Sequence, residues 1–230
     1  MATDPAAAGG ARVIDLSHPV GPGTQVFPGD TPPVVSPACT LAADGYNSVR
    51  LDLGSHTGTH ADAPYHFLSD GPRLGDLPLE LFTGPAVVVD ATGLAPRTPI
   101  GPEAFGPWED RLEPGAVVLV RTGWDRHYGT EAYYDHPYLS GAAARLLVAR
   151  GVRTVGLDTL SPDETPYAGR GGEDWSAHLA VLGAGGTVVE NLRGLAAADA
   201  PGARFCAFPL RLESGDGAPV RAVALLGDAS

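Results

Sequence analysis

Short apolar runs separated by glycine and proline recur along this chain, and they restrict the folds that it can adopt. Runs of this length, rich in β-branched residues, are typical of strands. After residue 84 we expect strands at 85–91, 116–124, 152–161, 187–192, 205–212 and 220–226. Before it, 13–20 is predicted to be a short strand, and 47–56 alternates apolar and polar residues like a half-buried strand.

Two segments between these runs have the features of helices. The segment 140–151 begins with Ser140, a suitable N-cap, and ends at Gly151. The segment 173–185 is predicted to form a second short helix. Its apolar face is expected to consist of Trp175, Leu179 and Leu182.

The size of the chain favours one folded unit. With 230 residues and 43% hydrophobic composition, the chain can bury a sizeable core. We predict an α/β fold: a single strand-rich domain over 11–230, with a compact mixed β core and helices packed around it. Residues 1–10 are expected to be disordered.

The charge balance narrows the choice of partner. The formal net charge is −12, whereas nucleic acid and anionic membranes require a basic face. We therefore expect a small-molecule partner, with neither nucleic acid nor membrane. Cys39 and Cys206 are far apart in the sequence, which indicates neither a disulfide framework nor a zinc site built from cysteines. The first residues lack the pattern of a secretory signal. No apolar segment reaches the length of about 18 residues expected of a membrane-spanning helix. A cytoplasmic location is expected.

A histidine-rich segment, "SHTGTHADAPYHF" at 55–67, is the strongest candidate for a functional site. It holds His56, His60, Asp62 and His66. The glycine and proline inside it favour a turn over a helix. Imidazole and carboxylate together suit zinc, manganese or iron, and three histidines within eleven residues favour a metal site over separate local hydrogen bonds. The sequence has no HExxH, GxSxG, Walker-type or GxGxxG motif that offers another explanation.

The segment "HTGTHADAPYH" resembles the HxGTHxDxPxH signature of the cyclase family, the metal-dependent hydrolases that include bacterial kynurenine formamidase and isatin hydrolase. The stretches "DLSHP", "FPGD", "GLDTLSPDE" and "HLAVLGAGGTVVENL" follow the family's order, so the resemblance covers nearly the whole chain. It implies a strand-rich core with packed helices, assembled as a homodimer or homotetramer. It also implies one or two divalent ions per subunit, Zn²⁺ first and Mn²⁺ as the alternative.

Carried over residue by residue, the resemblance assigns His66 as general acid/base rather than ligand. The ligands that it implies are His56, His60, Asp62, His178 and Glu190. Asp62 and Glu190 are the candidates to bridge two ions, since a carboxylate has two oxygens. The alternative for His178 and Glu190 is that they are surface groups.

The predicted chemistry is hydrolysis by a metal-activated hydroxide, with His66 carrying the proton to the leaving group. Asp158 and Ser161 are candidates to orient a ligand from the second shell or relay a proton, and strand-end capping is the alternative.

The Pro/Gly-rich loop 21–33 cannot be helical and is expected to rest on another surface. Within it, Phe27 replaces a tryptophan that contacts the aromatic substrate in bacterial kynurenine formamidases, so we expect it to bind substrate. The substrate itself is predicted only as an amide, formamide or small lactam or lactone. Two alternatives stay open: a ring-closing or dehydrating enzyme of secondary metabolism that uses the same metal site, and a catalytically silent metal-binding protein.

Overall fold

The computed structural model describes residues 12–227, so the predicted disordered segment 1–10 lies outside the described residues. The strands in this range are β1 (Arg12–Asp15), β2 (Val34–Cys39), β3 (Ser48–Asp52), β4 (His60–Asp62), β5 (Thr83–Asp90), β6 (Pro99–Ile100), β7 (Val117–Arg121), β8 (Tyr138–Leu139), β9 (Thr154–Leu157), β10 (Thr187–Glu190), β11 (Arg204–Cys206), β12 (Gly217–Pro219) and β13 (Val223–Leu226). The α-helices are α1 (Leu41–Asp44), α2 (Gly141–Ala149) and α3 (Ser176–Gly183). Within this part of the chain, no helix has the length and hydropathy needed to cross a membrane.

Nine of the strands form one mixed sheet, in the order β1-β13-β11-β5-β7-β9-β10-β4-β12. The central strands β5, β7, β9 and β10 are parallel, and the strands on either side pair antiparallel. Side chains of the central strands alternate between two core clusters, so Val87 and Val89 face one cluster and Val88 faces the other. Strands covered on both faces have unbroken apolar sequences. The predicted α/β fold with a strand-rich mixed core is confirmed.

Most strands are shorter than the apolar runs that predicted them, whereas β5, with eight residues, begins before its run at 85–91. The run 205–212 contributes only β11, and 152–161 leaves the sheet after β9. Strands β4 and β12 are absent from the predicted set, because three residues are too few to show a period-two pattern.

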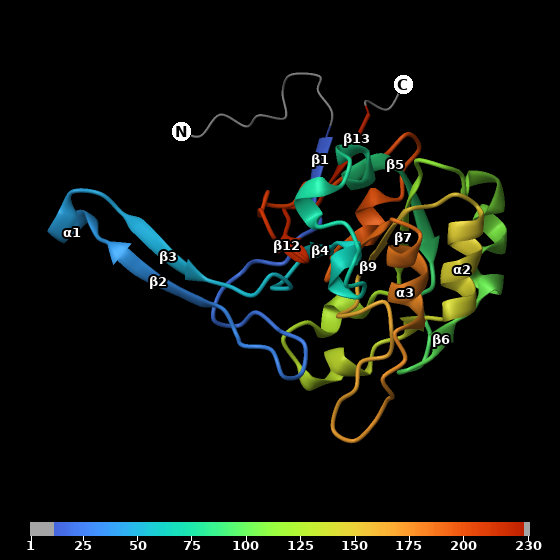
Figure 1. Ribbon diagram of the computed structural model, residues 1–230, viewed down its shortest axis with the longest axis horizontal. Coiled ribbons are helices and arrows are strands. Elements are labelled where there is room, and N and C mark those ends of the chain that lie inside the picture. Colours follow the sequence, from blue (N-terminus) through green and yellow to red (C-terminus); the bar gives the residue numbers. More distant parts are fainter. Residues whose placement is uncertain (1–11, 228–230) are drawn as a thin grey trace.

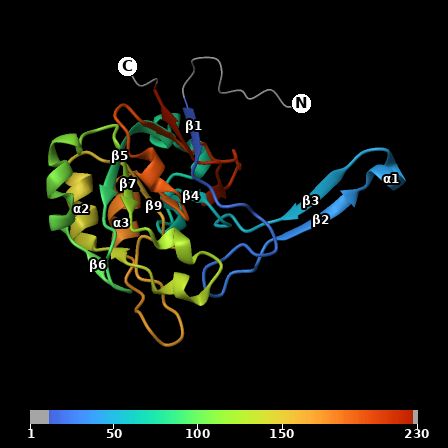
Figure 2. The ribbon, with the colours of Figure 1, turned by 180° about the vertical axis from the view of Figure 1, so that it is seen from behind.

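The helices α2 and α3 pack together beside the central strands (Figures 1 and 2). Helix α2 agrees with its prediction: the side chain of Ser140 accepts a hydrogen bond from the amide of Ala143, and Gly151 follows the helix with a φ of +87°. Such a φ favours glycine, so the chain turns there toward β9.

Helix α3 differs from the predicted second helix. It begins at Ser176 rather than at 173, with Trp175 at the N-cap position. Its buried residues are Ala177, His178, Val181 and Leu182. Of the expected face, only Leu182 is buried, while Leu179 is 46% exposed. The packing of α3 against α2 and β10 decides which stripe of side chains is buried, and that stripe includes His178.

Strands β2 and β3 form a separate hairpin that extends away from the body of the molecule (Figure 1). The predicted half-buried strand is therefore wrong in its burial. Val49 and Leu51 are 58% and 59% exposed. Alternation predicts that one face of a strand is apolar, but it does not specify what covers that face.

The loop 21–33 rests on a neighbouring part of its own chain. The side chain of Gln25 accepts a hydrogen bond from the amide of Gly129 (2.7 Å) and donates to the carbonyl of Thr130 (2.9 Å). Tyr134 donates to the carbonyl of Val26 (3.3 Å). These contacts order a loop that has no regular structure and place its tip near the histidine cluster.

Candidate metal centre

Strand β4 places two of the predicted site residues on one face. It lies between β10 and β12, and its alternation directs His60 and Asp62 to one side while Ala61 packs into the core. Glu190, the last residue of β10, is the cross-strand neighbour of His60. The expected turn over 55–67 is thus only partly correct, because a short strand occupies its middle.

The two other histidines reach the same point from outside β4. His56 lies in the turn before the strand, and His178 projects from α3. Strand β12 approaches His56 so closely that a Cβ atom on Gly217 would lie 2.7 Å from the ring. Only glycine fits at this position without displacing the histidine.

The carboxylates of Asp62 and Glu190 both lie between His60 and His178. Each carboxylate has one oxygen near the His60 ring and the other near the His178 ring. Nε2 of His60 lies 3.3 Å from Oδ1 of Asp62 and 3.2 Å from Oε2 of Glu190. Nε2 of His178 lies 3.4 Å from Oδ2 of Asp62 and 3.2 Å from Oε1 of Glu190. Two histidines therefore face each other across two carboxylates, and the four side chains are buried.

The outer nitrogens of these two histidines are held by oxygen acceptors. Nδ1 of His60 donates to the carbonyl of Gly58 (2.8 Å), and Nδ1 of His178 donates to the carboxylate of Asp163 (2.7 Å). A carbonyl only accepts, so the hydrogen of the His60 ring sits on Nδ1. This arrangement aims each Nε2 at the carboxylates, as is usual for histidines that bind metals.

The His56 ring also has one nitrogen facing Asp62 and the other facing an outer oxygen acceptor, but here Nδ1 faces Asp62 and Nε2 faces the outer acceptor. Its Nδ1 lies 2.8 Å from Oδ1 of Asp62, while its Nε2 lies 3.0 Å from Oδ2 of Asp216. The same oxygen of Asp216 lies 3.4 Å from Nδ1 of His66. The structure thus brings the five predicted ligands and His66 together and adds Asp216 to them.

The electrostatics of the cluster favour bound positive charge. Burial alone lowers the pKa of His60, but the carboxylates of Asp62 and Glu190 outweigh burial and raise it to about 10. Burial opposes ionisation of Asp62 as well, yet the adjacent His60, His178 and His56 hold the pKa of Asp62 well below its usual range. A divalent ion would replace protons here, so binding must release them.

Two buried atoms of the cluster lack a hydrogen-bond partner among the described residues. They are Nε2 of His60 and Oδ2 of Asp62. Both lie within 3.4 Å of atoms of opposite polarity. Unpaired buried polar atoms are costly, and donor atoms that converge without bonding one another fit a cation between them.

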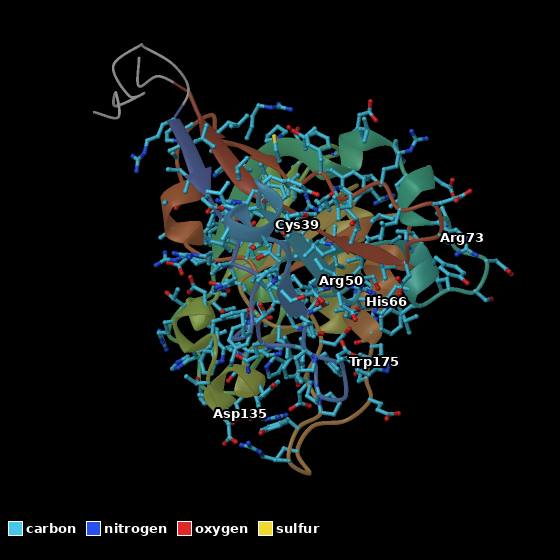
Figure 3. All side chains as sticks on the ribbon, turned by 90° about the vertical axis from the view of Figure 1, so that its left-hand side faces the viewer. Cys39, Arg50, His66, Arg73, Asp135 and Trp175 are labelled. Atoms are coloured by element: carbon cyan, nitrogen blue, oxygen red, sulfur yellow. The ribbon has the colours of Figure 1, made fainter. Side chains whose placement is uncertain are left out.

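An aromatic pocket of about 350 Å³ opens beside the cluster. Its walls include His66, Phe27, Phe67, Trp175 and Ser161. The ring centroids of Phe27 and Trp175 are 6.1 Å apart, and those of Phe67 and Trp175 are 5.7 Å apart. Figure 3 shows Trp175 and His66 close together on this side of the molecule. Burial lowers the pKa of His66, so its ring is neutral at pH 7 and can accept a proton.

Comparison with known families agrees with this geometry. The model of the cyclase family matches residues 14–164, which is more than half of the chain and includes the histidine-rich segment. The chain belongs to the cyclase family. His178 and Glu190 lie beyond the residues that the family model matches. Both lie within the longer alignments to the relatives described next.

Relatives of this cyclase-family chain extend over nearly its full length. A kynurenine formamidase of Bacillus cytotoxicus is 32% identical over 91% of this chain and 95% of the relative. Isatin hydrolase A from Labrenzia aggregata, solved with benzyl benzoate, superposes with a TM-score of 0.86 and 28% identity over 96% of both chains. A protein of Bacillus stearothermophilus described as a metal-dependent hydrolase gives a TM-score of 0.73 and 26% identity over 94% of this chain and 98% of that one.

Asp158 and Ser161, the two candidates to orient a ligand or relay a proton, lie in different places in this cyclase-family member. Asp158 caps the turn after β7, where its carboxylate accepts hydrogen bonds from the amides of Thr122 and Gly123 (2.8 Å each) and from the Thr122 hydroxyl (2.6 Å). This is the capping alternative, because these hydrogen bonds are made to the residues just after β7 and not to the residues of the cluster. Ser161 lines the aromatic pocket and accepts a hydrogen bond from the amide of Asp163 (3.2 Å).

Two carboxylates of the site are missing from the predicted set. Asp163 accepts hydrogen bonds from the His178 ring and from the first amides of α3, although it lies within the "GLDTLSPDE" stretch that carries the family resemblance. Asp216 stands in "ESGDGAPV", an ordinary turn sequence. Nothing local distinguishes either residue from an exposed acidic group.

A larger cavity of about 600 Å³ lies elsewhere, lined by His18, Arg126, Tyr128, Arg193 and the start of the loop 21–33. His18 stacks on Tyr128 at a centroid distance of 3.7 Å. Burial, together with Arg193, lowers the pKa of His18 to about 4, so the ring is neutral. The histidines and carboxylates converge at the smaller, aromatic pocket, so that pocket is the candidate reaction site of this cyclase-family chain.

Proposed function

We propose that the cluster is a metal centre whose ligands are His56, His60, Asp62, His178 and Glu190. The support is the convergence of their donor atoms. One set is formed by His56, His60 and Asp62, and a second by Asp62, His178 and Glu190, each with ligand atoms within 4.8 Å of one another. Because Asp62 belongs to both sets, these residues would hold one or two divalent ions per subunit. Imidazole and carboxylate donors favour zinc, with manganese as the alternative.

We propose that this centre serves hydrolysis of a carbon–nitrogen bond in an amide, formamide or small lactam, or of a small lactone. An ion bound by these ligands supplies a water of lowered pKa and a Lewis acid for a carbonyl oxygen. His66, neutral and on the pocket wall, takes a proton from the attacking water and gives it to the leaving nitrogen or oxygen. The observation that carries this proposal is the position of His66 on the pocket wall, beside five side chains whose donor atoms converge.

The aromatic pocket supports a small planar substrate. Phe27 and Trp175 stand on one side of the cluster, and Phe67 lies 4.6 Å from the His178 ring, centroid to centroid. Aromatic side chains bind flat rings by offset or edge contacts. We propose that Phe27 contacts the substrate, with Trp175 beside it, so the tryptophan of this pocket comes from the start of α3 rather than from the loop 21–33.

The proposed hydrolysis is tested with zinc- and manganese-loaded protein on N-formylkynurenine, isatin and a panel of lactones. We expect an acid product from at least one of them, measured by chromatography and by proton release. The Asp62→Ala protein is the control, and it should form none. If the loaded protein hydrolyses none of the panel, the ring-closing or dehydrating alternative is favoured. If the protein binds no metal at all, the metal-centre proposal fails as well.

We also propose a homodimer or homotetramer that forms through the β2–β3 hairpin, in a cytoplasmic enzyme. Leu51 lies opposite Val35, and Val49 lies opposite Pro37, so these four apolar residues share one face of the hairpin. A hairpin that stands alone is marginally stable in water. A second copy of the chain would offer an identical apolar face, which is how two-fold interfaces are built.

Charged substitutions on this face should separate the subunits. We expect Leu51→Asp and Val49→Asp to shift the protein from dimer or tetramer to monomer, because each places a carboxylate where the apolar faces meet. Ser36→Asp is the matched control, since Ser36 lies on the opposite face of the hairpin. Sedimentation velocity measures the mass. A wild-type chain that sediments as a monomer at micromolar concentration would contradict the proposal.

A further inference from the structure

We infer that Asp216 is a positioning residue that holds His56 and His66 together through one carboxylate oxygen. This inference rests on the proposed function, in which His56 is a ligand and His66 carries protons. It adds Asp216 as a residue that contacts both the proposed ligand and the proposed proton carrier.

The contact geometry carries the inference. Oδ2 of Asp216 lies 3.0 Å from Nε2 of His56 and 3.4 Å from Nδ1 of His66. The two imidazole rings are in contact but tilted, with centroids 3.9 Å apart and an interplanar angle of 31°. A single oxygen of Asp216 therefore lies near one nitrogen of each ring.

The backbone fixes Asp216 in this place without help from its side chain. Its carbonyl accepts a hydrogen bond from the amide of Ala63 (2.8 Å), and the preceding residue, Gly215, accepts one from Leu74 (2.9 Å). The following residue, Gly217, pairs with Asp62 across β12 and β4. The backbone at Asp216 is thus held on both sides by main-chain bonds, so replacing the side chain should leave the turn intact.

The contact determines which ring nitrogens face the site. With Nε2 of His56 bonded to Asp216, Nδ1 is the nitrogen that faces Asp62. With the Nδ1 edge of His66 against Asp216, Nε2 is left to exchange a proton with a substrate. The Asp163 carboxylate orients the His178 ring in the same way, and the Gly58 carbonyl orients the His60 ring. Asp216 differs from both because it also contacts His66, the proposed proton carrier. Partners of this kind contribute to metal affinity and to rate.

The first test measures zinc binding by the full chain. We expect Asp216→Asn and Asp216→Ala to weaken zinc affinity by about 10- to 100-fold, the usual effect of removing an outer partner of a ligand histidine. The number of zinc ions bound at saturation should stay that of the wild type. Glu213→Ala is the matched control, because it removes the same charge from an exposed position that precedes Asp216 in the same turn. Competition with a chelator gives the affinity, and circular dichroism verifies the fold.

The second test uses zinc-saturated protein, so that weaker binding cannot lower the rate. We expect kcat of both variants on the best substrate of the panel to fall about 10- to 100-fold with little change in KM. Sodium formate should partly restore Asp216→Ala, since the side chain of Asp216 is 36% exposed and its place is open to small carboxylates. Nitrogen-15 NMR should detect a mixture of His66 tautomers in Asp216→Ala, where the wild type has one.

Several results would overturn the inference. Wild-type zinc affinity, turnover and His66 tautomer in both variants would mean that Asp216 positions nothing. Loss of a whole zinc equivalent at saturation would make Asp216 a ligand instead. If the wild type binds zinc but hydrolyses no substrate, the hydrolase proposal fails while the affinity and NMR measurements still decide the role of Asp216. If the wild type binds no zinc, the proposed metal centre and this inference fail together.

Discussion

The Asp62→Ala protein, purified without chelators, is expected to contain little zinc or manganese and to have no measurable hydrolase activity. Asp62 directs one oxygen toward His56 and His60 and the other toward His178, so its loss removes a donor from both proposed metal sets. Loss of an outer partner alone weakens metal binding by about 10- to 100-fold, and loss of a shared ligand should exceed this. His60→Ala should behave in the same way.

Elemental analysis after dialysis gives the metal content. The buffer is kept at pH 8 rather than lower, because protons compete for the histidines of the metal-free cluster. Asp158→Asn is the matched control: it also changes a buried aspartate, but one bonded to Thr122 and Gly123, and it should retain its metal. Asp62→Asn preserves the shape of the side chain if the alanine variant is unstable. Full metal content in both His60→Ala and Asp62→Ala would refute the ligand assignment.

His66→Ala is expected to keep its metal and its fold while turnover falls by about 10²- to 10⁴-fold, the usual contribution of general acid/base catalysis. Along the chain, one turn separates His66 from the proposed ligand Asp62. Pro64 begins a short 3-10 helix after β4, and the amide of His66 donates to the carbonyl of Ala63 (2.9 Å). This turn places the His66 ring on the wall of the pocket, beside Phe67.

Metal content and turnover have to be measured on the same preparations of this variant. Added zinc should not restore activity, since an ion cannot replace a missing proton carrier. His127→Ala, which changes a histidine outside the pocket, is the control and should match the wild type in both measurements. Loss of metal from His66→Ala would instead make His66 a ligand, for which its position near His56 and Asp216 has suitable geometry.

Much of the fold follows from local patterns in the sequence. Continuous apolar runs predict the buried central strands, because residues covered on both faces of a sheet have no polar alternation. Ser140 and Gly151 predict the ends of α2, since capping depends on neighbouring residues alone. Two of the mistaken details, the buried face of α3 and the burial of β3, concern which surfaces of the fold pack against each other.

The histidine-rich segment by itself determined the kind of chemistry at this site, because imidazole and carboxylate within a few residues limit what can be bound. The placement of His178 and Glu190 beside it could be expected only through the family resemblance. Only the tertiary structure shows that Asp163 contacts His178 and that Asp216 contacts His56. Asp216 lies 160 residues from His56 in the sequence, and it reaches that ring because β12 pairs with β4. Pairing between distant strands depends on how the whole sheet closes, and no local pattern around an acidic turn residue records it.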